Sequence, residues 1–443
     1  MSGHGGIHFL DTRPLRGSRP FRDLWIGTSA SRLGGQIATV AVLAQVWDLT
    51  GSPLGTGAIG LATGLPMVLF GLLGGTLADT FDRRTVVRVT TVGGLLAAAG
   101  LCAQAVAGNR NVILLLALVA VGTSCSALGA PARRTFPVRL LPSDQVAAGL
   151  ALMNVSFQAA MLAGPALAGL VIARWDIPAA YATQAVTATI AALSLIRLPA
   201  LPPDGAAAAG SKRRPERGGW RILRRPTLWG SMATDLSATL LAMPIALFPL
   251  VNEIRFDGNP QTLGLFLSAV AVGGITAGLL SGTVTRWRRG GLVQLSAAAV
   301  WGLALACFGL AGPLWLALAC LAIAGAADTV SVITRGALVQ LETPDAYRGR
   351  VSSVEHVIGV AGPELGNFRG GLLASATSAS FSLVFGGLSA VLAIAAVAAT
   401  NGPLRAYRTP TPTEKPTAPE TTKAATGQKA DAAHGKGGPP RVS

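Results

Sequence analysis

The sequence has few charged residues, few aromatic residues and few cysteines for its length of 443 residues. Charged residues make up 13% of the chain and aromatic residues 5%, whereas hydrophobic residues reach 51% and the mean hydropathy is +0.52. An ordinary soluble domain carries about 25% charged residues, so this composition excludes most soluble proteins. We therefore expect lipid to surround most of the chain.

Long segments without charge recur along the chain and predict an all-α membrane protein with twelve transmembrane helices. A helix needs about 20 apolar residues to cross a bilayer core about 30 Å thick. The segments are continuously apolar, which disfavours a transmembrane β-barrel because barrel strands alternate lipid-facing and lumen-facing residues. The predicted spans are residues 24–47, 56–78, 86–108, 112–131, 146–173, 180–199, 228–252, 262–284, 292–311, 313–334, 351–374 and 379–399.

The distribution of Lys and Arg predicts the orientation of these spans. Cytoplasmic loops carry the excess of positive residues in membrane proteins. If both termini are cytoplasmic, nearly all of the 36 Lys and Arg residues fall on that side of the cell membrane. The same bias accounts for the net charge of +16, so the charge does not indicate nucleic-acid binding.

Proline and basic residues interrupt the hydrophobic pattern at residues 200–226, which we interpret as a cytoplasmic linker. The linker would join a six-helix bundle at residues 23–199 to a second at residues 227–402. Residues 1–22 would form a cytoplasmic tail. Residues 403–443 are rich in Thr, Pro, Lys, Ala and Gly, and such a segment buries too little apolar surface to be ordered.

The two halves resemble each other in sequence. Arg133 lies nine residues before Pro142, and Arg335 lies nine residues before Pro344. The run Ala-Gly-Pro also occurs in both halves, 198 residues apart. Repeated halves in a polytopic protein predict pseudo-twofold symmetry with a transport route between them.

A string of small and charged residues, GTLADTFDRR at residues 75–84, lies between the second and third predicted spans. It resembles the signature of the major facilitator superfamily, and the resemblance implies a twelve-helix transporter with a gate at Asp79. Thr80 and Asp82 depart from the signature, although the Asp-Arg-Arg form is similar to the branch of enterobactin exporters and macrolide-efflux-like proteins. The matching residues are Gly75, Leu77, Ala78, Asp79, Arg83 and Arg84.

Gly164, Pro165 and Gly169 in the fifth predicted span resemble a motif often associated with exporters of this superfamily. Proline removes an intrahelical hydrogen bond and glycine thins the helix, so we expect a kink that can bend against a neighbouring helix. A packing kink without any bearing on the direction of transport is the alternative.

Charged residues within predicted spans are functional candidates because burying them in a membrane is costly. Arg32, Asp235 and Asp328 lie in the first, seventh and tenth predicted spans. The resemblance to the superfamily implies that these spans line a central cavity with the three residues at similar depth, so we expect Arg32 to pair with one of the two acids. A structural network of Asp328 with Arg335, two turns along the same helix, is the alternative for that acid.

Glu364 lies near the middle of the eleventh predicted span, where the first half has Ala166. Burial favours the neutral form of a carboxyl group, so Glu364 is our candidate for proton coupling. A neutralising partnership with Arg369 is the alternative.

The remaining motifs exclude other classes of function. The string G-x-G-x-x-G at residues 55–60 opens a transmembrane span and does not follow a strand, so it does not indicate a dinucleotide site. A phosphate-binding loop, a nucleophile elbow and a metal-ligand cluster are all missing from the sequence. We therefore expect a protein that is not an enzyme and has no cofactor or metal.

These observations predict a secondary transporter that exports a small amphipathic molecule, a drug or a siderophore, by alternating access. Protons are the expected coupling ion, and the transporter is expected to act as a monomer. The direction of export comes from the family resemblance. An importer of the same fold and a non-transporting membrane receptor or scaffold remain alternatives.

Overall fold

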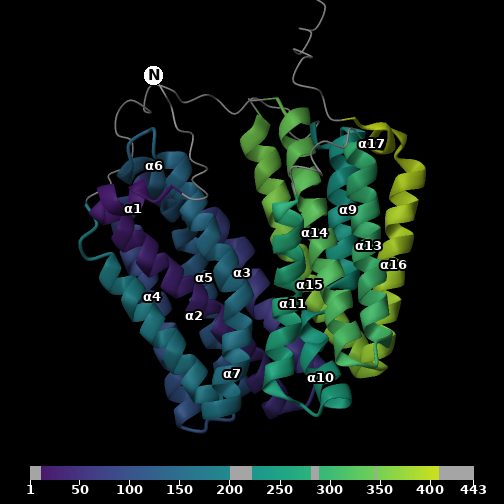
Figure 1. Ribbon diagram of the computed structural model, residues 1–443, viewed down its shortest axis with the longest axis horizontal. Helices are drawn as coiled ribbons and strands as arrows, with labels where there is room; N and C mark the ends of the chain where they lie inside the picture. The colour runs from purple at the N-terminus through teal and green to yellow at the C-terminus, as the bar shows by residue number, and fades with distance from the viewer. Residues whose placement is uncertain (1–10, 200–221, 281–288, 345–346, 409–443) are drawn as a thin grey trace, which may run out of the picture.

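The computed structural model describes residues 11–199, 222–280, 289–344 and 347–408 (Figure 1). These residues are almost entirely helical and contain no strand. The helices are α1 (Arg13–Gly17), α2 (Arg19–Thr50), α3 (Pro53–Thr80), α4 (Arg83–Val106), α5 (Val112–Arg134), α6 (Phe136–Leu140), α7 (Val146–Ser194), α9 (Pro226–Ala242), η1 (Ile245–Leu247), α10 (Phe248–Phe256), α11 (Pro260–Leu279), α13 (Gly290–Leu310), α14 (Leu314–Glu342), α15 (Arg348–Ala376), α16 (Ala379–Thr400) and α17 (Gly402–Ala406).

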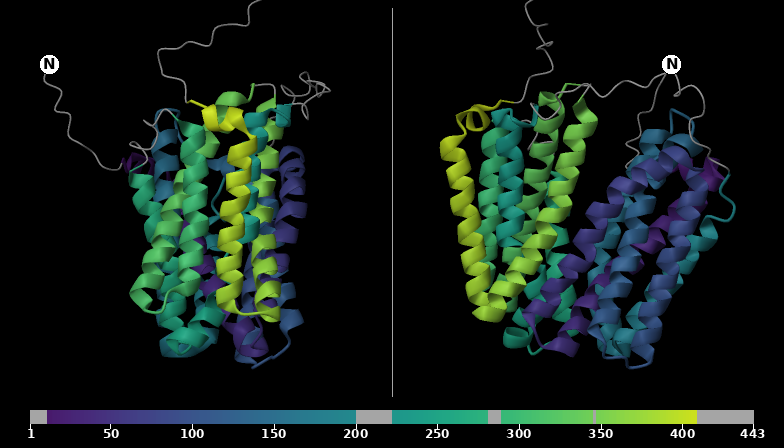
Figure 2. Two further views of the ribbon diagram at one scale, coloured as in Figure 1. Left: turned by 90° about the vertical axis from the view of Figure 1, so that its right-hand side faces the viewer. Right: turned by 180° about the vertical axis from the view of Figure 1, so that it is seen from behind.

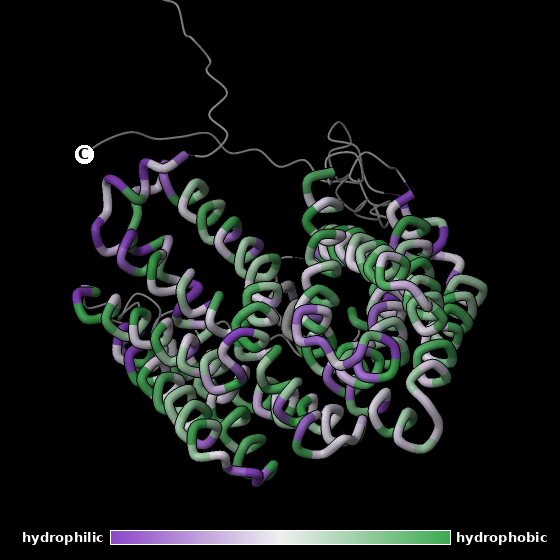
Figure 3. The backbone as a smooth tube through the Cα atoms, turned by 60° about the horizontal axis from the view of Figure 1, so that its bottom comes forward, coloured by the Kyte–Doolittle hydropathy of each residue, from purple (hydrophilic) through white to green (hydrophobic). Residues whose placement is uncertain are grey.

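The helices form two groups, which we call the N-half (α1–α7) and the C-half (α9–α17). Figures 1 and 2 show that the halves lie close together at the end that carries α10 and diverge toward the end that carries α6. We call these the α10 end and the α6 end. Hydrophobic residues predominate along the helices in Figure 3, as expected for a chain surrounded by lipid.

Helix α7 contains two predicted spans that fold back on each other. Trp25 Nε1, near the start of α2, donates a hydrogen bond to the Leu152 carbonyl, 3.1 Å away. Gly27, two residues further along α2, faces Ser194 at the other end of α7. Both ends of α7 therefore lie beside the start of α2. The chain reverses at Asp176, which has a φ of 71° and is the one residue of α7 with non-helical backbone angles.

Nine segments among the described residues are long and apolar enough to cross a membrane. One of them, α7, supplies two crossings. Helices α2 and α15 have 32 and 29 residues, but they carry more polar side chains and are not among the nine. Together these helices form the predicted twelve-helix fold.

Side chains that accept backbone N–H groups fix several helix starts. Asp82 accepts a hydrogen bond from the Arg84 N–H at the start of α4, at 2.8 Å. Such a cap satisfies one of the donors that the first turn leaves free. The other side-chain caps of long helices are Ser18 on α2, Asn111 on α5, Asn259 on α11 and Ser378 on α16.

Helical structure reaches into both predicted tails. Phe21, near the start of α2, is fully buried although it lies within the predicted tail of residues 1–22. Leu404 in α17 is also fully buried, and the Asn401 amide donates a hydrogen bond to the Pro226 carbonyl at the start of α9. The predicted linker and the rest of the predicted C-terminal tail lie mostly outside the described residues.

Candidate functional site

Helices α3 and α15 cross between the halves through a row of glycines on α3. A Cβ atom added to Gly60 would lie 2.4 Å from the Glu364 carbonyl oxygen, and one added to Gly64 would lie 2.6 Å from the Glu364 Cβ. A Cβ atom added to Gly57 would lie 3.3 Å from the Gly371 Cα, a looser contact. Small residues at such spacing let two helix backbones approach each other in a membrane. The glycine string that could suggest a dinucleotide site therefore serves helix packing.

A second crossing joins α7 of the N-half to α11 of the C-half. A Cβ atom added to Gly264 would lie 2.3 Å from the Pro165 carbonyl oxygen, and one added to Gly169 would lie 2.7 Å from the Pro260 carbonyl oxygen. Gly164 instead packs against Gln36 of α2. The backbone angles stay helical through all three motif residues, and the kink at this motif stays a prediction. These residues form a close contact between the halves.

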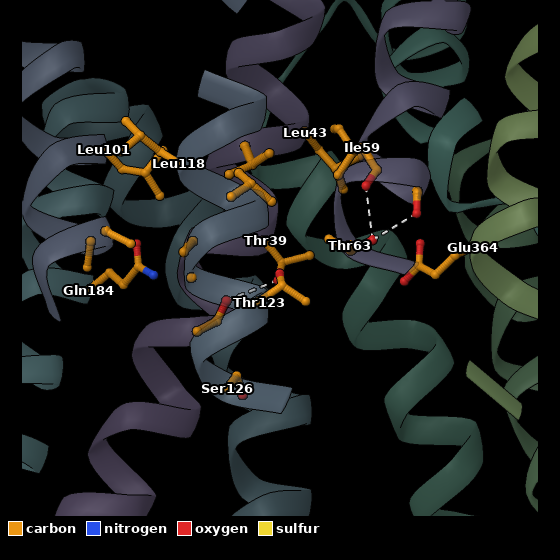
Figure 4. A pocket seen from close by; sticks show the side chains of 18 of the residues that line it. Thr39, Leu43, Ile59, Thr63, Leu101, Leu118, Thr123, Ser126, Gln184 and Glu364 are labelled. Atoms are coloured by element: carbon orange, nitrogen blue, oxygen red, sulfur yellow. Dashed lines mark hydrogen bonds between the residues drawn. The ribbon is translucent and has the colours of Figure 1, made fainter. Parts of the chain in front are cut away.

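Glu364 reaches from α15 into a cavity of ≈ 430 Å³ formed mainly by the N-half and closed on one side by η1 and α15 (Figure 4). The carboxyl group lies within hydrogen-bonding reach of the Thr63 side chain on α3 and of Asn367 on its own helix. The Asn367 Oδ1 accepts the Ala246 N–H, so its amide group remains free to donate toward Glu364. Glu364 thus connects both halves at one cavity.

Arg369 is not the partner of Glu364. Its guanidinium donates a hydrogen bond to the Leu241 carbonyl at the end of α9 and packs beside Gly386 of α16. The alternative in which Arg369 neutralises Glu364 is therefore wrong for this structure. Arg369 ties α15 to two other helices of the C-half.

The predicted gating motif lies at the end of α3 and the start of α4. Gly75 has open space where a side chain would be, whereas Gly74 packs against the Leu128 carbonyl of α5. Arg83 is buried, and the Arg84 Nη1 donates to the Leu198 carbonyl at 3.3 Å. The side chain of Asp79 lies outside the described part of the structure. Gly74, and not the motif residue Gly75, therefore packs closely against α5.

The C-half contains a compensated cluster of buried charges. Arg335 pairs with Asp235, and its Nε lies 3.3 Å from the Glu355 Oε1. Asp235 and Arg335 are 6% and 7% exposed. Asp328 lies close enough to interact electrostatically with both. The structure therefore favours the network of Asp328 with Arg335, extended by two acids from other helices.

Arg32 lies in the N-half and does not form the expected pair with Asp235 or Asp328. Its Nη1 donates to the Met153 carbonyl at 2.6 Å and to Ser156 Oγ at 3.3 Å. The guanidinium also lies over the ring of Phe157, 5.4 Å from its centroid. Arg32 is thus held by α7 of its own half.

The sequence matches the family described as "Transmembrane secretion effector" over residues 12–427. The chain belongs to this family. It is a multi-pass membrane transporter of the major facilitator superfamily and not an enzyme, and its partners include the lipid bilayer and a small-molecule substrate. The enterobactin exporter EntS of Citrobacter koseri is 27% identical to it over 420 residues, which cover 92% of this chain and 96% of that protein.

Solved structures of transporters share the fold of this chain. A POT family transporter in complex with 5-aminolevulinic acid has a TM-score of 0.70 and 12% identity, covering 87% of this chain and 97% of its own. A bacterial homologue of the iron transporter ferroportin, in an inward-facing state, has a TM-score of 0.66 and 15% identity, covering 87% and 99%. These likenesses support the twelve-helix architecture.

Sequence reasoning did not nominate three residues of the sites described for this transporter. Arg133 lines a cavity of the N-half, and Glu355 belongs to the buried charge cluster of the C-half. Thr63 lies in no recognisable sequence motif. The internal repeat could have indicated Arg133. Its counterpart in the second half is Arg335, which was already a candidate because it lies on the same predicted helix as the buried acid Asp328.

Proposed function

We propose that the protein exports a small amphipathic compound, of the drug or siderophore class, in exchange for protons. The observation that carries this proposal is Glu364, a carboxyl group from the C-half that lies in a cavity beside Thr63 of the N-half. A carboxyl group at a contact between two moving halves can couple its protonation to their separation. The relatives named as enterobactin exporters support export and a siderophore-like substrate.

The proposed orientation places the α6 end and both termini in the cytoplasm, and the protein in the cell membrane as a monomer. Arginine side chains gather at this end and bind the ends of helices, as positive residues of cytoplasmic loops do. Arg88 donates to the Leu195 and Ile196 carbonyls at the end of α7, for example. The linker at residues 200–226 would then be cytoplasmic and join the two six-helix bundles.

The proposed gate comprises Gly75, Asp79, Arg83 and Arg84, at this same end. Arg84, at the start of α4, binds the Leu198 carbonyl just past the end of α7, and α4 directly follows α3 in the chain. A movement of α3 against α5 would therefore also shift α4 and, through Arg84, the end of α7. We also propose that the halves rotate against each other about a contact region that includes Gly164, Pro165 and Gly169, which pack against α2 and α11.

The test measures transport by the purified protein in proteoliposomes, with enterobactin and several lipophilic cations as candidate substrates. We expect a proton gradient to stimulate flux of a substrate several-fold in the wild type. Glu364→Gln should abolish this stimulation while substrate exchange without a gradient continues, because the amide cannot take up a proton. Asp257→Asn, at an exposed acid near the α10 end, is the matched control and should behave as wild type.

Three results would contradict the proposal. Flux that is indifferent to the gradient in the wild type would refute antiport. Accumulation of the substrate on the side of the α6 end would identify an importer. Absence of flux for every compound, with binding retained, would favour a receptor or scaffold.

A further inference from the structure

A second cavity, of ≈ 670 Å³, lies within the N-half between α2, α4, α5 and α7 and extends to α6. Its lining includes the three arginines Arg32, Arg133 and Arg134, and no acidic residue. Ser126 lines both this cavity and the one that contains Glu364, so the two are neighbours. We call it the arginine cavity.

The guanidinium groups of the arginine cavity keep free hydrogen-bond donors. Arg32 uses only its Nη1 for hydrogen bonds within the described part of the chain. Arg133 forms no hydrogen bond or ion pair there, and it lies close enough to Arg32 for the two charges to repel each other. Its Nη2 folds back over Gly129, 2.6 Å from where a Cβ would be, a position open only beside glycine.

A buried hydroxyl group adds to these donors. Thr91 lines the arginine cavity, is 8% exposed, and has no hydrogen-bond partner for its Oγ1 among the described residues. Buried polar groups are nearly always paired in folded proteins. An unpaired hydroxyl beside two close cations indicates that a ligand with acceptor atoms completes the site.

The corresponding place in the C-half is neutralised by the protein itself. Arg335 lies 202 residues after Arg133, Asp328 lies 202 residues after Ser126, and Asp235 lies 203 residues after Arg32. The C-half therefore surrounds its arginine with acids, whereas the N-half has serine and a second arginine at those positions. The N-half therefore has no acidic residue at the positions where the C-half has Asp328 and Asp235.

We propose that the arginine cavity binds an anionic oxygen group, such as a carboxylate, a phenolate or a phosphate, of the transported compound. This inference rests on the proposed function and specifies the chemical class of its substrate. Guanidinium groups bind such groups through paired N–H donors and neutralise their charge. A bound anion would also remove the repulsion between Arg32 and Arg133. The apolar neighbours, among them Phe157 and Leu150, would contact the rest of an amphipathic molecule.

The test measures equilibrium binding to the full-length protein in nanodiscs of zwitterionic lipid, without any proton gradient. Salicylate is the anionic probe, and salicylamide is a neutral probe of nearly the same shape. We expect salicylate to bind and salicylamide to bind at least about tenfold more weakly, because a charged hydrogen bond is lost. Inorganic phosphate should compete with salicylate.

Variants assign the binding to the proposed residues. Arg133→Gln should weaken salicylate binding about tenfold, with no effect on salicylamide. Ser126→Asp, which introduces the acid that the C-half has at this position, should weaken it by a similar factor through repulsion of the anion. Arg110→Gln, at an exposed arginine outside the cavity, is the control. Arg133→Lys keeps the charge and should restore part of the affinity, which separates a charge effect from misfolding.

The proposal is overturned if both probes bind equally or if Arg133→Gln binds salicylate as the wild type does. Nanodiscs containing anionic lipid distinguish a second source of the same chemistry. If anionic lipid occupies the cavity and neither salicylate nor phosphate binds in its absence, the cavity is a headgroup site and the proposal fails. Because the assay requires no transport, its result is independent of whether the protein proves to be a proton-coupled exporter.

Discussion

Arg133 and Arg335 occupy corresponding positions in the two halves but lie in opposite electrostatic surroundings. Arg335 contacts two acids and is near a third, whereas Arg133 has a second arginine as its charged neighbour. The close contacts between the halves, in contrast, are alike, since Gly60 and Gly264 both pack against a backbone carbonyl of the other half. The glycine contacts between the halves are thus similar, whereas the charges around the two arginines differ. This difference indicates that the two halves pack against each other in the same way but that their buried charges have different roles.

The largest expected effect is the loss of stability when the charge of Arg335 is removed. Arg335→Leu leaves Asp235 buried without its partner, and breaking a buried pair costs about 3–5 kcal/mol. Arg133→Leu removes a cation that has no acidic partner, so it should leave the free energy of unfolding unchanged or raise it. Thermal unfolding of both variants in the same detergent gives the comparison. Equal destabilisation would show that the two arginines have the same structural role.

The similarity of the two crossings is tested by adding a methyl group to each. Gly60→Ala and Gly264→Ala should each destabilise the protein by about 1–3 kcal/mol, because the added Cβ meets a carbonyl that cannot move aside without shifting a helix. Gly278→Ala on α11 meets no atom within 4 Å and controls for helix propensity. Destabilisation by only one of the two substitutions would refute the structural equivalence of the crossings.

The smallest expected effect concerns the starts of α4 and α13, which begin after the basic loops of the two halves. Asp82 caps α4, whereas Arg289 at the start of α13 gives no side-chain cap. Asp82→Ala should lower the free energy of unfolding by about 1 kcal/mol, and Arg289→Ala should have no such effect. Denaturant titration followed by circular dichroism measures both. Unchanged stability of Asp82→Ala would show that this cap does not stabilise the fold.

Hydropathy, charge distribution and internal repeats were sufficient to predict the twelve helices and the two halves, and the resemblance of residues 75–84 to a known signature predicted the superfamily. They were not sufficient to orient side chains around a helix. Gly74 and Gly75 differ by about 100° of rotation, and only the position of α5 decides which of them is packed. The partner of Arg32 depends on which helix lies against it, and that helix is α7 of its own half.

The reversal within α7, by contrast, was predictable from hydropathy. The predicted spans at residues 146–173 and 180–199 leave a turn between them, and the chain turns at Asp176, where the Asp176 Oδ1 accepts the Ile177 N–H at 2.7 Å. A kink at Gly164 and Pro165 stays a prediction, since the backbone angles there are helical.

The short helix α17 has a practical consequence for handling this protein. The side chain of Leu404 is fully buried, and its carbonyl oxygen lies against Gly291 at the start of α13. A truncation before Asn401 would uncover this apolar contact and remove the amide that holds the start of α9. Affinity tags and fluorescent reporters therefore belong after Arg408, where they leave the contacts between α17 and the rest of the C-half intact.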